Sequence, residues 1–210
     1  MIRVLIVDDH AIVRRGLKEV FDDEFSELET GEAENSRAAL ELISTQDWDI
    51  VLLDINLPGR NGLEVLSEIK RLRPRTPVLI VSAYPEEEFA IRSLKLGASG
   101  YLNKSSASDE VVAAARKAMA GGKYVTALLA EKLAAMLGSD IQREVHESLS
   151  SREFQVLQMI ANGSTIKEIA AELALSEKTV GTYRTRISNK MGLATNVELT
   201  RYALQHRLVD

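Results

Sequence analysis

Short apolar runs alternate with amphipathic stretches along the first 120 residues of the chain. Five runs, three strong and two weaker, predict strands: 2–7, 49–53, 77–82, 27–33 and 99–104. Apolar residues recur at helical spacing in five stretches that follow them: 11–21, 36–45, 63–72, 86–96 and 108–120. Strands that are apolar throughout and alternate with helices predict an α/β doubly wound fold, with a five-stranded parallel sheet covered on both faces.

Strand patterns stop after residue 125, and the rest of the chain is helical in pattern. Residues 126–138 predict one linker helix, and the polar stretch 139–148 has no strong period. Three capping boxes follow, in which a hydroxyl and a glutamate cap each other's backbone amides: Ser150 with Glu153, Thr165 with Glu168, and Thr195 with Glu198. Ser176 can cap a fourth helix. We therefore expect a first domain over 1–121, a linker over 122–148, and an all-α four-helix domain over 149–210.

Composition narrows the class of protein. The chain of 210 residues is 45% hydrophobic and has no cysteine, which excludes disulfides and cysteine-based metal sites. No apolar run approaches the ~20 residues of a membrane helix, and the N-terminus lacks a signal-peptide pattern, so we expect a cytoplasmic protein. Residues 149–210 hold 8 basic and 6 acidic residues, whereas the rest holds 18 and 25. This asymmetry indicates two modules with different partners.

Carboxylates follow two of the predicted strands. Asp8 and Asp9 end the first, and Asp54 ends the strand at 49–53. The carboxyl ends of parallel strands face a common crevice, so these groups are expected to lie together. Clustered carboxylates repel one another unless a cation neutralises them, and Mg²⁺ prefers such oxygen ligands.

Two further polar side chains are expected at the same edge of the sheet. Lys104 ends the last predicted strand, and Ser82 ends the strand before it. Carboxylate, divalent metal, lysine and hydroxyl together can hold a phosphoryl group. Asp54 is then the expected nucleophile. Each residue alone is commonly a cap or solvated surface; their occurrence at successive strand ends favours the functional interpretation.

Residues 1–121 resemble the flavodoxin-like receiver domain of two-component response regulators. The matching motifs are "VDD" (7–9), "LLDINLPGRNG" (52–62), "VSA" (81–83) and "GYLNK" (100–104). The resemblance implies that Asp54 accepts a phosphoryl group from a sensor histidine kinase. It also implies that Asp9, Asp54 and the backbone carbonyl of Asn56 hold Mg²⁺, with Asp8 binding directly or through water.

The same resemblance assigns Lys104 to the phosphoryl oxygens, and Ser82 with Tyr101 to a switch pair. In that switch the hydroxyl moves toward the phosphate and the aromatic ring turns inward. One position departs from the family pattern: receivers often carry proline after the lysine, and here Ser105 follows Lys104.

Residues 164–193 contain two helical patterns joined by the short stretch "LALS". This arrangement suits a helix-turn-helix, whose second helix enters the DNA major groove. From 178 to 190 there are four basic residues and no acidic residue: Lys178, Arg184, Arg186 and Lys190. On pattern alone, a helical protein-interaction module with a solvated basic face remains an alternative.

Residues 149–204 resemble the LuxR-type helix-turn-helix of the NarL/FixJ class of response regulators. The matching motifs are "LSSREFQVLQMIANG", "KEIAAEL", "LSEKTVGTY" and "NKMGL". Gly181 and Tyr183 stand where the family usually has lysine and histidine. Base readout is therefore expected from Thr182 and Thr185, by hydroxyl or methyl contacts, with Lys178 and Arg184 near the rim. Phosphate contacts are expected from Thr179, Arg184, Arg186 and Lys190.

Together these expectations describe a phosphorylation-activated transcription regulator of a bacterial two-component system, and not an enzyme. We expect the protein to form a homodimer when Asp54 is phosphorylated, with the last helix (196–206) as a dimer contact. This homodimer is expected to bind double-stranded promoter DNA. One alternative is a pseudo-receiver that regulates without phosphorylation. The other is a Mg²⁺-dependent phosphohydrolase, which usually needs a second carboxylate two residues after the nucleophile. Asn56 occupies that position.

Overall fold

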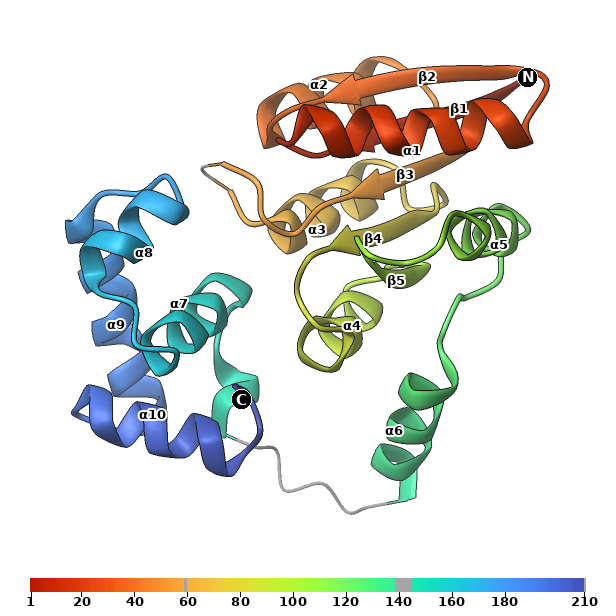
Figure 1. Cartoon of the computed structure of the whole chain (residues 1–210). Coiled ribbons are helices and arrows are strands. Elements are labelled where there is room, and N and C mark those ends of the chain that lie inside the picture. The colour runs from red at the N-terminus through yellow and green to blue at the C-terminus, as the bar shows by residue number, and fades with distance from the viewer. Residues whose placement is uncertain (59, 139–144, 210) are drawn as a thin grey trace. The chain divides into compact units, whose positions relative to one another are not determined.

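The computed structural model describes residues 1–58, 60–138 and 145–209 (Figure 1). The chain divides into two compact units, Met1–Ser139 and Asp140–Asp210. The helix expected in the linker, α6 (Ala127–Gly138), falls in the first unit. Among the described residues, no helix has the length and apolar character needed to cross a membrane.

The first unit is built on a five-stranded parallel sheet in the order β2-β1-β3-β4-β5. The five strands have these bounds: β1 (Ile2–Val7), β2 (Leu28–Ala33), β3 (Ile50–Leu53), β4 (Val78–Ser82) and β5 (Gly100–Asn103). The three central strands are buried along almost their whole length, as expected for a sheet with both faces covered. This arrangement confirms the predicted fold class.

Four helices connect consecutive strands, and α5 (Ser108–Met119) follows β5: the connecting helices are α1 (Ala11–Glu24), α2 (Ser36–Thr45), α3 (Gly62–Leu72) and α4 (Glu86–Lys95). Helices α1 and α5 lie together on one face, where Phe21 and Val111 join one apolar core with Ile6, Leu52 and Val81 from the strands. Right-handed crossovers place the other three helices on the opposite face, and α2 packs against α3 there.

The second unit is helical throughout its described part. Its described part begins with a short 3₁₀ turn, η1 (Val145–Ser148), which lies in the polar stretch 139–148. Residues 139–144 of that stretch lie outside the described part. Four helices follow: α7 (Ser151–Ala161), α8 (Ile166–Glu172), α9 (Glu177–Met191) and α10 (Asn196–Gln205). The structure confirms all three capping boxes and the Ser176 cap. Gly192 ends α9 in the left-handed conformation (φ 68°), which glycine adopts without steric cost.

Candidate functional site

Asp8 and Asp54 stand side by side at the carboxyl edge of the sheet. They follow the paired residues Val7 and Leu53, and the Asp54 amide donates to the Val7 carbonyl at 2.9 Å. Both aspartates are 2% exposed. Asp9 comes next along the chain, and its side chain is 30% exposed. Strand register therefore fixes two buried carboxylates next to each other.

Lys104 supplies the positive charge that these carboxylates need. Its Nζ lies 2.6 Å from Asp8 Oδ2 and 2.8 Å from Asp54 Oδ2. The Lys104 amide donates to the Ser82 carbonyl at 2.8 Å, which continues the pairing of β5 with β4. Burial lowers the pKa of Lys104, but the hydrogen bonds to Asp54 and Asp8 outweigh it and raise the pKa above its usual value. Lys104 is therefore a cation at neutral pH.

The acidic cluster has the donor set of a divalent-cation site. One ligand atom from each of four residues lies within 4.8 Å of the others: Asp8, Asp9, His10 and Asp54. Asp54 Oδ1 is buried and has no hydrogen-bond partner within the described part of the chain. A buried carboxylate oxygen without a donor is costly unless a cation or another ligand satisfies it. The residues present therefore fit Mg²⁺, which prefers carboxylate oxygens.

His10 is part of this cluster, although the sequence analysis did not select it. Its Nδ1 lies 2.7 Å from Asp9 Oδ1 and 3.2 Å from Asp8 Oδ1, and its amide donates to Asp8 Oδ1 at 2.8 Å. The triplet "DDH" carried the signal, because the residue after two strand-end acids must lie close to them.

The loop after Asp54 turns back tightly over the strand end. A Cβ atom at Gly62 would overlap the Asp54 carbonyl oxygen, so only glycine fits there. The Gly62 amide donates to the Ile55 carbonyl at 2.8 Å, and Asn61 caps α3 by accepting from the Leu63 amide. Asn56 is half-buried in this loop, two residues beyond Asp54.

The backbone of Tyr84 connects the two predicted switch residues. Ser82 is fully buried, and its Oγ accepts a hydrogen bond from the Tyr84 amide at 3.4 Å. The Tyr84 carbonyl accepts a hydrogen bond from the Tyr101 hydroxyl at 2.8 Å and from Asn103 Nδ2 at 3.4 Å. Tyr101 is 1% exposed, so its ring points inward. The sequence held no signal for Tyr84, because its backbone makes these contacts.

Ser105, where the family often has proline, makes a bond that proline cannot make. Its amide donates to Asn103 Oδ1 at 2.9 Å, and its hydroxyl donates to the same oxygen at 2.7 Å. Because proline has no N–H, this chain orders the loop around Lys104 by a side-chain turn instead.

In the second unit, α9 presents a polar face opposite its buried face. Val180, Ile187 and Met191 are buried in the domain core. The candidate DNA-contact residues fall into two groups by exposure. Exposed are Lys178, Thr182, Thr185, Arg186 and Lys190; half-buried are Thr179 and Arg184.

Arg184 and Lys190 also hold the domain together. Arg184 donates to Asn196 Oδ1 at 2.9 Å and to the Ala194 carbonyl at 2.8 Å, which ties α9 to the turn before α10. Lys190 Nζ lies 2.6 Å from Oε2 of Glu153. Burial raises the pKa of Glu153, but hydrogen bonds from Lys190 and Ser150 outweigh it, so the net pKa lies below its usual value. A DNA-contact role for these two basic residues stays a prediction.

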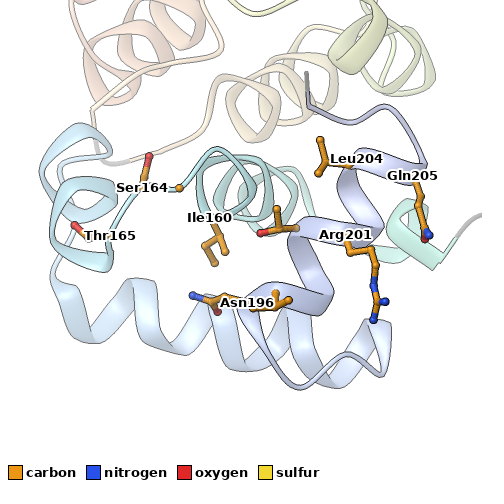
Figure 2. A pocket seen from close by; sticks show the side chains of 10 residues that line it. Ile160, Ser164, Thr165, Asn196, Arg201, Leu204 and Gln205 are labelled. Atoms are coloured by element: carbon orange, nitrogen blue, oxygen red, sulfur yellow. The ribbon is translucent and has the colours of Figure 1, made fainter.

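A groove of about 640 Å³ lies between α10 and the segment that joins α7 to α8. Figure 2 shows Ile160 and Thr165 on one side and Asn196 and Leu204 on the other. Two of the residues that line it on α10 are large, exposed apolar side chains: Val197 is 75% and Leu204 is 50% exposed. Exposed apolar groups around a groove are typical of a contact surface.

Comparisons with known proteins agree with this architecture. Residues 4–116 match the response regulator receiver domain family, and residues 147–203 match the luxR family of bacterial regulatory proteins. Response regulator GacA of Pseudomonas aeruginosa is 37% identical over 214 residues, covering the whole chain and 99% of GacA. Response regulator UvrY of Escherichia coli K12 is 36% identical, covering the whole chain and 97% of UvrY.

Among solved structures, the chain resembles RcsB from Salmonella enterica serovar Typhimurium. In that structure RcsB is bound to promoter rprA in the presence of the phosphomimetic BeF3-. The TM-score is 0.65 at 25% identity, over 96% of this chain and 97% of that one.

Proposed function

Because the chain belongs to the response regulators that join a receiver domain to a LuxR-type DNA-binding domain, we propose that phosphorylation of Asp54 controls its binding to promoter DNA. The observation that carries the proposal is Asp54 itself, a buried carboxylate with one oxygen bound to Lys104 and the other without a donor among the described residues. That second oxygen is the expected nucleophile.

The phosphoryl group comes from the phosphohistidine of a sensor histidine kinase. An Asp54 carboxylate oxygen attacks phosphorus, and the phosphorus–nitrogen bond breaks with its electron pair returning to the imidazole. The product is an acyl phosphate on Asp54. Mg²⁺, held by Asp8, Asp9, Asp54 and the backbone carbonyl of Asn56, supplies positive charge to the phosphoryl oxygens when it is bound.

Lys104 is close enough to Asp54 to bind the phosphoryl group that this reaction adds. Its ammonium lies between Asp8 and Asp54, so a short movement brings it to a phosphoryl oxygen on Asp54. The phosphoryl group carries more negative charge than the Asp8 carboxylate, so it competes with Asp8 for a charge-assisted hydrogen bond from Lys104.

Ser82 and Tyr101 transmit the change to the surface. A phosphoryl group on Asp54 attracts the Ser82 hydroxyl, which now accepts the Tyr84 amide. Since the Tyr84 carbonyl holds Tyr101, a shift of this loop changes the packing of α4 and β5 together. Reversing a two-state equilibrium from 1:99 to 99:1 takes about 5.5 kcal/mol of differential stabilisation.

The output is dimerisation and insertion of α9 into the major groove of promoter DNA, in the cytoplasm. The exposed basic side chains Lys178 and Arg186 support phosphate contact. The apolar groove beside Val197 and Leu204 supports a contact between two copies through α10. The structure of the related RcsB, bound to a promoter in the presence of a phosphomimetic, supports the link between phosphorylation and DNA binding.

The test is intact-mass measurement after incubation with a small acyl-phosphate donor and Mg²⁺. We expect one labile phosphoryl adduct on the wild-type chain, none on Asp54→Asn, and none when a chelator removes the metal. Asp22→Asn, an exposed acid on α1, is the matched control and keeps the adduct. If no adduct forms with this donor or with a phosphorylated histidine kinase while DNA binding persists, the protein is a pseudo-receiver.

A further inference from the structure

Both predicted base-reading threonines of α9 turn their hydroxyl groups back onto their own helix. Thr182 Oγ1 donates to the Lys178 carbonyl at 3.0 Å, and Thr185 Oγ1 donates to the Gly181 carbonyl at 3.0 Å. A hydroxyl has one proton to donate. These bonds therefore use the proton that a threonine would otherwise offer to an acceptor atom of a base.

Each threonine keeps two features that can face a base: the hydroxyl oxygen, which can still accept a hydrogen bond, and the methyl group. The Cβ of threonine carries one hydroxyl and one methyl group, so a hydroxyl turned toward the backbone leaves the methyl group away from it. Both threonines are exposed, on the side of α9 opposite Val180 and Ile187. At these two positions the polar face of α9 therefore offers exposed methyl groups between its charged side chains.

Gly181 leaves the helix surface beside these two threonines without a side chain. A Cβ added there would meet nothing within 4 Å, so the packing of the domain does not require glycine at this position. Its consequence lies at the outer surface, where the absence of a side chain allows a base edge to approach the helix closely.

We propose that Thr182 and Thr185 select DNA sequence through their methyl groups, by contact with the C5-methyl group of thymine in the major groove. Thymine C5-methyl is the apolar group that base pairs present there, and threonine methyl is one of its recognised partners. The inference rests on the proposed DNA-binding function and narrows it to half-sites with a thymine under each threonine.

The experiment first enriches a bound sequence from random duplex DNA with the full-length chain, incubated with Mg²⁺ and an acyl-phosphate donor. Each thymine of the selected duplex is then replaced by uracil, which removes the methyl group and keeps the Watson–Crick pairing. Loss of one buried methyl contact should weaken binding about three- to fivefold. We expect this loss at one or two thymines of each half-site.

Paired variants assign the loss to a side chain. Thr182→Ser and Thr185→Ser keep the hydroxyl and remove the methyl group, so each should bind the uracil and thymine duplexes equally at its own position. Thr182→Val and Thr185→Val keep a methyl group in the same place and should keep the preference for thymine. These positions are exposed, so neither change disturbs the core.

The outcomes separate this inference from the proposed function. A chain that enriches a sequence but tolerates uracil at every position, or loses thymine preference in the valine variants, overturns the methyl readout alone. A chain that enriches no sequence overturns the proposed DNA-binding function and this inference with it.

Discussion

Thr126 donates a hydrogen bond from its hydroxyl to Oε2 of Glu86 at 2.8 Å, which joins the start of α6 to the first residue of α4. The Leu129 amide donates to the same threonine oxygen at 3.2 Å, and Leu129 is 2% exposed. Just before this, Tyr124 pairs with Gly100 at the edge of β5. The chain that leaves the receiver domain is thus attached to α4 and β5, the elements next to Ser82 and Tyr101.

We predict that Thr126→Val loosens α6 from α4. Valine keeps the shape and loses the hydrogen bond, which contributes about 1 kcal/mol. Amide exchange in 127–134 should rise several-fold, and the ratio of DNA affinities with and without phosphorylation should fall. Thr45→Val removes a hydroxyl whose described hydrogen bonds are to carbonyls of its own helix, and it should change neither quantity. Unchanged exchange in 127–134 contradicts the prediction.

Replacing Lys104 with methionine should destabilise the receiver domain and make its stability depend on Mg²⁺. The variant leaves the buried carboxylates of Asp8 and Asp54 without their paired cation, at a cost of about 3–5 kcal/mol. Urea denaturation followed by Trp48 fluorescence should show a lower midpoint at pH 7, largely restored by millimolar Mg²⁺. Lys18→Met, an exposed lysine of α1, is the control. A urea midpoint that does not change when Mg²⁺ is added argues against the cation site.

The Glu153–Lys190 ion pair should make the stability of the DNA-binding domain depend on pH. The pKa of Glu153 is lowered in the folded state, so its stabilisation is present above its usual pKa of 4.5 and is lost as pH falls through the folded-state value. Lys190→Met should reduce the protection of α7 amides at pH 7. It should also flatten the decline in protection on acidification, as measured by hydrogen exchange between pH 3 and 7. An equally steep decline in the variant would show that the Glu153–Lys190 pair does not cause the pH dependence.

Leu204→Lys should prevent contact between copies without affecting phosphorylation. A lysine at the rim of the apolar groove places a charge in the contact, where desolvation is costly. Sedimentation of the phosphorylated protein should show a monomer, and DNA affinity should fall at least tenfold. Ala171→Lys, an exposed change on α8 outside the groove, should leave the dimer intact. A Leu204→Lys protein that still dimerises would place the contact elsewhere.

The pattern of strand ends predicted most of the acidic site, because parallel pairing necessarily brings Asp8, Asp54 and Lys104 to one edge. Capping boxes were equally predictable, since Ser150 and Glu153 interact across three residues. The sequence could not show hydrogen-bond partners that are brought together only by tertiary packing. The bonds of Arg184 to Asn196 and of Tyr101 to the Tyr84 carbonyl depend on how separate elements meet. Neither has a local signature.

The attachment of α6 to α4 has a consequence during synthesis of the protein. The described contacts that attach Tyr124 and α6 to the receiver domain lie within Met1–Ser139. A ribosome that adds about 5–20 residues per second needs about 4–14 s more to make the second unit. The receiver domain can therefore fold on the nascent chain before α9 exists.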